Sequence, residues 1–412
     1  MRVAFGQFIV DTQAERLWKN GVEVRLREQP LQVLLILLRD PGEVVSRDTL
    51  REHLWGGSTY VDFENGLNTA ISRLREVLED DANNPLWIER VPKRGYRFIG
   101  ALPRSAAVAA YIKGHHVISP HSPENMQKSL AFFREAMTLD PSYPLAYHGA
   151  ALVSILRCLQ DDLRPQEALP EADAYLQQGL RCSQQAGMVY NTLALLRTFE
   201  RRWGEADEAS RTALALEPEN PHVHMIRAQL LSCLAQHEEA IRAATLAVDL
   251  DPIHLRAHMH LTRVLCYAGR WDACVQAGKA GLEVCPDPYI GIYTSQALLE
   301  MGKPQEALEL NLQTRRSGNL LAAEVAYNAY IAARAGNPGE AVSALSLLEQ
   351  SRRHRYVPAI TLCWLELALG NDYLAMKWLH TARSEGEPYL AFMDVDPMYD
   401  RLRTHEKIME LG

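Results

Sequence analysis

The side chains with the clearest binding chemistry lie between residues 62 and 79. Apolar residues at positions 67, 71, 74 and 78 recur at the spacing of one helix face, which predicts a helix that buries them in a core. The polar residues between them then point outward or sideways. Asn and Arg side chains pair with adenine and guanine edges through two hydrogen bonds. This stretch therefore predicts a helix suited to a DNA major groove, with candidate contacts from Asn65, Asn68, Thr69, Ser72, Arg73 and Arg75.

A second group of cations follows on a short alternating stretch. Residues 87–91 and 96–99 read as two strands around a Pro-Lys-Arg-Gly turn, and no acidic residue lies between Arg90 and Arg97. A basic hairpin tip fits a narrow minor groove, which attracts cationic side chains. Arg90, Lys93 and Arg94 are therefore candidates for DNA contact, whereas Arg97 has two interpretations, a DNA contact or a structural ion pair.

Two further arginines open an earlier predicted helix. Arg47 and Arg51 have two interpretations of equal weight, contact with phosphates or ion pairs with Asp48 and Glu52. Arg47 is retained among the DNA-binding candidates.

The elements that must position these side chains read as a small mixed domain. Residues 3–10, 16–18 and 22–26 alternate like three strands, and Asn20-Gly21 is a hairpin turn between the last two. Helices are expected from Pro30, Ser46 and Asp62, residue types that favour helix starts. Three helices followed by a basic hairpin describe a winged helix-turn-helix.

Three motifs of this domain carry a family resemblance. They are Val45–Asp48 with Leu54-Trp55, then Ile71–Arg75, then Val91–Phe98. In this order they resemble the OmpR/PhoB-type DNA-binding domain of CadC-like and HilA-like regulators, over residues 1–101. The resemblance implies double-stranded DNA as partner, with Asn68, Ser72, Arg73 and Arg75 facing the groove. It also implies RNA polymerase contact by the loop at residues 56–61 and self-association as a homodimer on direct repeats.

The rest of the chain repeats with a period of 34 residues. Small residues mark the register at Ala172, Ala206, Ala240, Cys274, Ala307, Ala341 and Ala375. Each unit reads as helix, turn, helix and Pro stop, which resembles the tetratricopeptide repeat. We expect about eight repeats between residues 107 and 385, followed by a capping segment at 394–397. The predicted fold is an α+β winged helix-turn-helix domain (residues 1–102) and an all-α tetratricopeptide-repeat superhelix (residues 103–412).

The repeat register also predicts which side chains line the concave groove of the superhelix. They include Arg and Tyr, which are common interface anchors. The partner-binding candidates are Arg256, Arg263, Tyr267, Tyr289, Tyr330 and Arg334. We expect a protein or peptide partner with some acidic character. The alternatives are a groove that is only solvated and a groove covered by the protein itself.

Composition and motifs disfavour several other classes of protein. The net charge is −8, and residues 1–104 hold 15 basic and 15 acidic residues, so local clustering and not overall charge indicates DNA. Seven scattered cysteines without CxxC spacing disfavour a zinc ribbon or disulfide framework. His224 and His258 share a repeat position, which favours packing over metal binding. No phosphate loop, dinucleotide, zinc-protease or nucleophile-elbow motif is present, so we expect neither an enzyme nor a cofactor.

The chain lacks a signal-peptide pattern and an apolar run long enough to span a bilayer, so we expect a cytoplasmic protein without membrane contact. The preferred interpretation is a sequence-specific DNA-binding transcriptional regulator whose solenoid binds a partner or effector, or another copy of itself. One alternative is an interaction scaffold with a degenerate winged helix. The other is an effector-sensing repressor with a small-molecule site in the solenoid.

Overall fold

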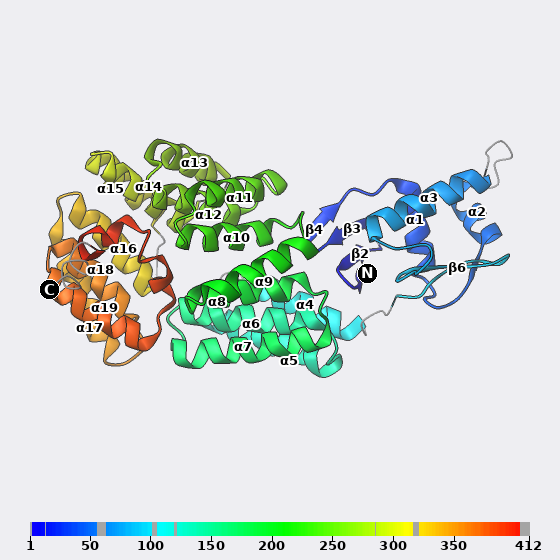
Figure 1. Cartoon of the computed structure of the whole chain (residues 1–412), viewed down its shortest axis with the longest axis horizontal. Helices are drawn as coiled ribbons and strands as arrows, with labels where there is room; N and C mark the ends of the chain where they lie inside the picture. Colours follow the sequence, from blue (N-terminus) through cyan, green and yellow to red (C-terminus); the bar gives the residue numbers. More distant parts are fainter. Residues whose placement is uncertain are drawn as a thin grey trace. The chain divides into compact units, whose positions relative to one another are not determined.

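The computed structural model describes residues 2–12, 14–55, 63–100, 105–118, 122–284, 286–315 and 321–403. The chain forms two compact units (Figure 1). One contains residues 1–112 and 135–143, and the other contains residues 113–134 and 144–412. The boundary expected at residue 102 stays a prediction, because residues 101–104 lie outside the described ranges.

The N-terminal sheet has four antiparallel strands in the order β1-β2-β3-β4, where three strands were predicted. They are β1 (Arg2–Phe5), β2 (Phe8–Asp11), β3 (Arg16–Lys19) and β4 (Val22–Val24). The expected single strand over residues 3–10 is wrong, because Gly6 adopts φ +50° and turns the chain back so that Phe5 pairs with Phe8. The predicted turn at Asn20-Gly21 is confirmed, since both residues have positive φ.

Three helices and a second sheet complete this domain. The helices are α1 (Glu28–Leu37), α2 (Arg47–Trp55) and α3 (Phe63–Leu78). The sheet has the order β5-β7-β6, with β5 (Val45–Ser46), β6 (Ile88–Val91) and β7 (Gly95–Phe98). The predicted cap of α2 is confirmed, because the Ser46 hydroxyl accepts the Thr49 N–H at 3.0 Å. The buried faces of α1 and α3 share one core with Phe5, Phe8 and Phe98.

The described part of the second half contains sixteen helices, and those from α6 to α19 pack in seven successive pairs, as a repeat fold requires (Figure 1). They are α4 (Ser105–Val117), α5 (Pro123–Leu139), α6 (Pro144–Leu159), α7 (Pro165–Cys182), α8 (Gly187–Phe199), α9 (Trp203–Leu216), α10 (Pro221–Cys233), α11 (His237–Leu250), α12 (Leu255–Tyr267), α13 (Trp271–Val284), α14 (Pro288–Glu300), α15 (Pro304–Thr314), α16 (Ala322–Arg334), α17 (Pro338–Arg352), α18 (Ala359–Leu369) and α19 (Asp372–Glu385).

Two features recur at fixed positions of the repeat. The seven small residues that marked the register are all completely buried on the second helix of a pair. The turn between the helices of a pair contains one residue in the left-handed region. It is Gly269, Gly302, Gly336 or Gly370 in four repeats, and Arg201 (φ +58°) or Ala235 (φ +56°) in two earlier ones. A period of 34 residues therefore corresponds to one conserved backbone path per repeat.

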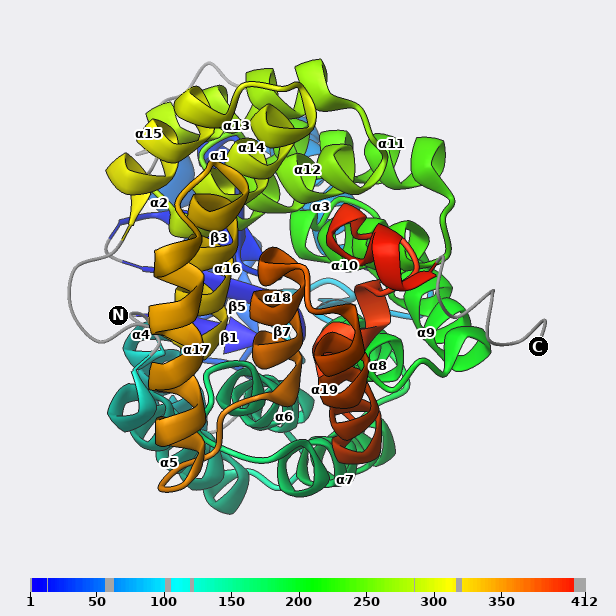
Figure 2. The same ribbon diagram turned by 90° about the vertical axis from the view of Figure 1, so that its left-hand side faces the viewer.

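The solenoid coils far enough for distant repeats to touch. The loop between α6 and α7 and the first turn of α7 contact the last two helix pairs (Figure 2). The Asp161 carboxylate accepts the Ala322 N–H at the start of α16 at 2.6 Å, and the Gln166 amide donates to the Glu385 carbonyl at 2.8 Å. The Arg164 guanidinium lies 5.4 Å from the centre of the Tyr356 ring. The stack of repeats is therefore closed on itself and not an open array.

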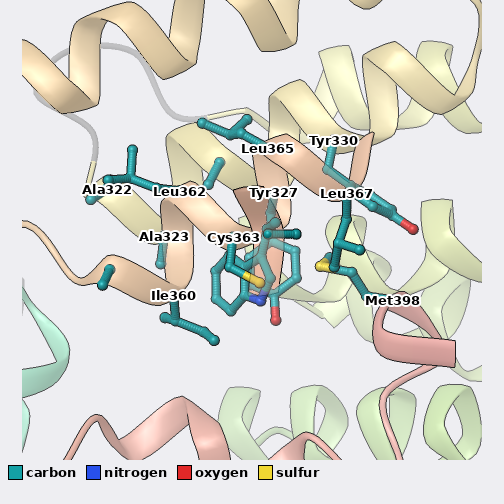
Figure 3. Packing of buried hydrophobic residues seen from close by; sticks show 14 of the residues in the cluster. Ala322, Ala323, Tyr327, Tyr330, Ile360, Leu362, Cys363, Leu365, Leu367 and Met398 are labelled. Carbon is teal, nitrogen blue, oxygen red and sulfur yellow. The ribbon is translucent and has the colours of Figure 1, made fainter. Parts of the chain in front are cut away.

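A C-terminal segment, defined here as residues 388–399, fills the inside of this coil (Figure 2). It consists of two short 3-10 helices, η1 (Pro388–Phe392) and η2 (Pro397–Tyr399), joined by a turn. Its first part contacts α8 and α10, and its second part contacts α18. Figure 3 shows Met398 of this segment beside Leu367 of α18, within the core of the last repeats.

Candidate nucleic-acid interface

The outward face of α3 carries most of the predicted contact residues. Asn65, Asn68, Thr69, Ser72 and Arg73 are all exposed, because Leu67, Ile71 and Leu74 on the opposite face are buried in the core. The five side chains, together with Glu76, line one shallow hollow. The helix period thus brings a row of hydrogen-bonding groups to the surface in a single stripe.

A hydrogen-bonded group of three side chains fixes the amide in the middle of this stripe. The Arg47 guanidinium donates to the Tyr96 hydroxyl at 3.0 Å and to Asn68 Oδ1 at 3.4 Å, and the Tyr96 hydroxyl donates to Asn68 Oδ1 at 3.3 Å. Because a guanidinium can only donate, the amide oxygen and not the nitrogen must face it. Both acceptor sites of Asn68 are then occupied, which leaves its NH₂ group to contact a ligand.

Arg75 does not lie on the outward stripe, which corrects its predicted position, but it lines the hollow between α3 and the hairpin. Its side chain is only 13% exposed, donates to the Ile88 carbonyl at 2.7 Å and lies 3.6 Å from the Asp80 carboxylate. The reason is its lateral position on α3, which faces strand β6 of the hairpin. Arg75 therefore joins α3 to the hairpin.

The hairpin presents three of its four cations to solvent. Arg90, Lys93 and Arg94 are exposed, and Lys93 sits at the tip with φ +61°. Arg97 instead forms an ion pair with Glu89 directly across the strand pair, which decides between its two interpretations in favour of the structural one. Three cations thus remain at the tip and on one strand, without an acidic residue among them.

Two residues that position this surface were not among the candidates. One is Tyr96, whose hydroxyl joins Arg47 to Asn68. The other is Asp80, whose buried carboxylate accepts the backbone N–H groups of Leu86, Trp87 and Ile88 at 2.6 to 3.0 Å and so fixes the start of the hairpin. Alternation along the second strand of the hairpin predicts that Tyr96 faces the helices. This pattern could have identified Tyr96 as a positioning residue. The role of Asp80 depends on a loop conformation that no sequence pattern specified.

The structure also places the two remaining groups of candidates. Arg47 contacts Tyr96 and Asn68, whereas Arg51 lies 3.4 Å from Asp48 as an ion pair. The loop expected to contact RNA polymerase, residues 56–61, lies outside the described residues.

The predicted partner-binding residues do not line an open groove, which corrects that expectation. Arg263 and Tyr267 are buried beneath Phe392 of the C-terminal segment, at 4.8 and 5.7 Å from its ring centre. Tyr330 is also buried, accepts a hydrogen bond from Arg334 and packs with the last repeats. The physical reason is that the chain supplies its own occupant, the alternative that the sequence left open.

The two other groove candidates, Tyr289 and Arg256, are both partly buried. Tyr289 is half-buried and packs against the clusters that contain Tyr327 and Phe392. Arg256 is half-buried, and burial lowers the pKa of its guanidinium. His224 and His258, which share a repeat position, each bond to a proline carbonyl, at 2.7 and 2.8 Å.

Comparison with known proteins decides the identity of the first domain. Residues 21–98 match the family model described as "Transcriptional regulatory protein, C terminal". The N-terminal domain is an OmpR/PhoB-type winged helix. This winged helix is 32% identical over 98 residues to the "Transcriptional activator CadC" of Escherichia coli K12, which covers 24% of this chain and 19% of that protein.

A second relative matches over a longer stretch of the chain. The "Cholera toxin homolog transcriptional activator" of Vibrio parahaemolyticus is 30% identical over 147 residues, which covers 33% of this chain and 50% of that protein. The chain thus spans half or less of the length of these curated relatives. None of the helices in the described ranges has the length and hydropathy of a membrane span.

One solved structure is similar to this chain at the level of fold alone. It is the human IFIT1 dimer with m7Gppp-AAAA, with a TM-score of 0.51 and 14% identity over 81% of this chain and 82% of that one.

Proposed function

We propose that this protein is a sequence-specific, double-stranded DNA-binding transcriptional regulator. In this proposal α3 reads base edges in the major groove, and the hairpin, or wing, enters the adjacent minor groove. The observation that carries it is a shared hollow: Asn68 and Ser72 of α3 and Arg90 and Tyr96 of the wing line the same depression. A base-reading surface and a cationic hairpin are therefore contiguous on one domain.

The distribution of charge supports the same proposal. Two acidic groups of the wing and the end of α3 have cationic partners: Glu89 pairs with Arg97, and Glu79 pairs with Lys19 at 2.7 Å. The cations Arg90, Lys93 and Arg94 keep their attraction for phosphate, because the sequence between them contains no acid. Glu76 borders the stripe on α3, so we place the margin of the interface there.

The relatives give the biological context of the proposal. The matched proteins are named as transcriptional activators, and the surface described here offers binding groups without the arrangement of a nucleophile and base. We therefore propose a role in transcription without catalysis. Asn65, Thr69, Ser72 and Arg73 are assigned to the major groove, and Arg90, Lys93 and Arg94 to phosphates or the minor groove. Arg47 is assigned to positioning Asn68.

The test is selection of random duplex DNA by the full-length protein, followed by affinity measurements on the enriched site as salt is raised. We expect a motif whose binding constant falls steeply with salt, because phosphate contacts release counterions. Recovery of no motif, with weak and salt-independent binding, would contradict the proposal and favour the interaction scaffold. An affinity for the site that changes with a small metabolite would instead favour the effector-sensing repressor.

A further inference from the structure

The C-terminal segment packs against the inner helices of the solenoid through specific side-chain contacts. Its Phe392 ring lies 6.5 Å from Phe199 of α8 and 5.7 Å from Tyr267 of α12, measured between ring centres. The Arg263 guanidinium lies 4.8 Å from the centre of the same ring. Two helices, α8 and α12, from repeats that are not adjacent in sequence to the segment thus form a pocket for one aromatic side chain.

A carboxylate four residues later provides the second anchor. Asp396 is 1% exposed, and its Oδ1 accepts the Gln296 amide N–H of α14 at 3.0 Å and the Met398 N–H at 2.9 Å. At the edge of the same surface, Asp394 pairs with Arg201 at 3.1 Å while both side chains stay partly exposed. The surface therefore recognises an aromatic ring and a carboxylate at a spacing of four residues.

The inner surface of the coil offers more hydrogen bonds than this segment uses. Gln229, Arg263 and Gln296 occupy the same position in three successive repeats and are 3, 7 and 2% exposed. Within the described part of the chain, Gln229 Nε2, Arg263 Nε and Gln296 Oε1 have no hydrogen-bond partner. Buried polar atoms of a permanent core are normally paired. In the part of the chain that the structure describes, residues 388–399 leave these atoms of Gln229, Arg263 and Gln296 without partners. We therefore expect another ligand to pair with them better than residues 388–399 do.

We propose that the inner surface formed by α8, α10, α12 and α14 is a peptide-binding site for a partner protein. The partner carries an aromatic residue followed four positions later by a carboxylate, and residues 388–399 hold the site until it displaces them. The proposal goes beyond DNA binding and does not rest on it. The segment is tethered, so its effective concentration is on the order of millimolar, and a partner must outcompete it.

The experiment uses the full-length protein and a fluorescein-labelled peptide with the sequence of residues 387–400, followed by fluorescence polarisation. Wild-type protein is compared with the double variant Phe392→Ala/Asp396→Asn, and Tyr373→Ala serves as a control because Tyr373 is 84% exposed on α19. We expect the double variant to bind the peptide at least about tenfold more tightly than wild type or the control, because its internal competitor is weakened. A peptide carrying the same two substitutions should not bind.

A second variant covers the case in which the double variant fails to fold. Asp394→Ala removes the ion pair of the segment with Arg201 at the edge of the surface, leaves Arg201 available to the peptide, and should give a smaller gain in the same direction. Equal binding of both peptides by the folded variants, or no binding by any folded variant, would overturn the proposal. A wild-type dimer that becomes monomeric in Phe392→Ala would also overturn it and would assign the site to a second copy of the chain.

Discussion

At the scale of single residues, two kinds of cation in the winged helix should have different effects on DNA binding. Arg73 is exposed on the stripe of α3, and Lys93 is exposed at the tip of the wing. We expect Arg73→Ala to cost about 1–3 kcal/mol of binding free energy at the selected site and to relax base preference there. Lys93→Ala should weaken binding to all DNA sequences similarly and should lower the slope of log binding constant against log salt by about one. Titration of specific and unrelated duplexes at several salt concentrations measures both effects.

The matched control for these variants is Arg97→Ala, since Arg97 is already paired with Glu89. It should leave the salt slope nearly unchanged. If Arg73→Ala and Lys93→Ala both bind the selected site as wild type does, the proposed docking of the domain is wrong.

The Tyr96 hydroxyl gives a sharper prediction about which base is read. Tyr96→Phe removes one of the two donors to Asn68 Oδ1, so the amide regains a free acceptor. An amide with a donor and an acceptor available suits adenine, whereas a donor alone suits guanine or thymine. We expect the selected motif to admit adenine at one position in the variant, with a loss of about 0.5–1.5 kcal/mol at the original site. An unchanged motif and affinity would contradict the role given to this group.

A buried histidine should make the solenoid sensitive to acid. His148 is 2% exposed and lies 2.7 Å from the Thr192 hydroxyl. Burial, with smaller contributions from His115 and His222, lowers the pKa of His148 to about 3. The folded state therefore disfavours the proton, and the stability due to neutral His148, complete above the unfolded pKa near 6.5, is lost as pH falls toward 3.

The predicted difference between pH 7 and pH 5 is about 2 kcal/mol of unfolding free energy for this residue. His148→Gln, which can keep a hydrogen bond to Thr192, should reduce the acid sensitivity by that amount in urea titrations at the two pH values. The exposed His380→Gln should not change it. A pH dependence that is the same in all three proteins would show that His148 is not responsible.

The residues also show how far sequence alone could define the interface. Helical periodicity placed Asn65, Asn68 and Arg73 on the surface because the buried face of a helix is determined by its own apolar spacing. It could not place Arg75, whose surroundings depend on which strand packs against the flank of the helix. Periodicity therefore predicts the exposed centre of a helix face better than its margins.

At the scale of elements, the repeat turn allows a direct test of backbone strain. Ala235 has φ +56° at the position where four other repeats have Gly, and a side chain in this region is unfavourable. We expect Ala235→Gly to stabilise the solenoid by about 0.5–1 kcal/mol. The gain is smaller than the strain energy that is removed, because Gly also raises the conformational entropy of the unfolded chain. Gly269→Ala, with φ +66°, should destabilise it by a similar amount. Thermal unfolding measures both, and shifts of equal sign would contradict the explanation.

The elements themselves were largely predictable, with one instructive exception. The period of 34 residues identified the helix pairs, because every repeat must bury the same small residue. The first strand was wrong, because Gly6 reverses the chain between residues that alternate like one strand. Alternation does not reveal a two-residue turn when its flanks are both apolar.

At the scale of the whole molecule, closure of the coil couples repeats that are distant in sequence. A linear repeat array unfolds nearly as a sum of neighbouring units. Here the Asp161 carboxylate accepts the Ala322 N–H across four intervening helix pairs, α8 to α15, so loss of this bond should weaken cooperativity as well as stability. We expect Asp161→Ala to cost about 1–3 kcal/mol and to lower the denaturant slope of unfolding.

Asp162→Ala is the matched control for this prediction. Asp162 pairs locally with Arg157 at 2.5 Å and contributes nothing across the coil that would change cooperativity. Far-ultraviolet circular dichroism during urea unfolding measures the slope for both variants. A slope that is unchanged in Asp161→Ala would mean that closure does not couple the repeats.

Closure was not predictable from the sequence for a geometric reason. The period defines one repeat, but contact between Asp161 and Ala322 depends on small rotations accumulated over many repeats. The position of the C-terminal segment inside the coil was also not predictable. This segment lacks the repeat pattern and was expected only to cap the last helices.

The contact between Asp161 and Ala322 also constrains how this protein can evolve. Open solenoids gain and lose units by duplication and deletion, since each unit needs only its neighbours. Insertion of one more unit between these two residues would rotate Ala322 away from its carboxylate and widen the space that Phe392 fills. We therefore expect duplications between α7 and α16 to be disfavoured, because they would break this closing contact.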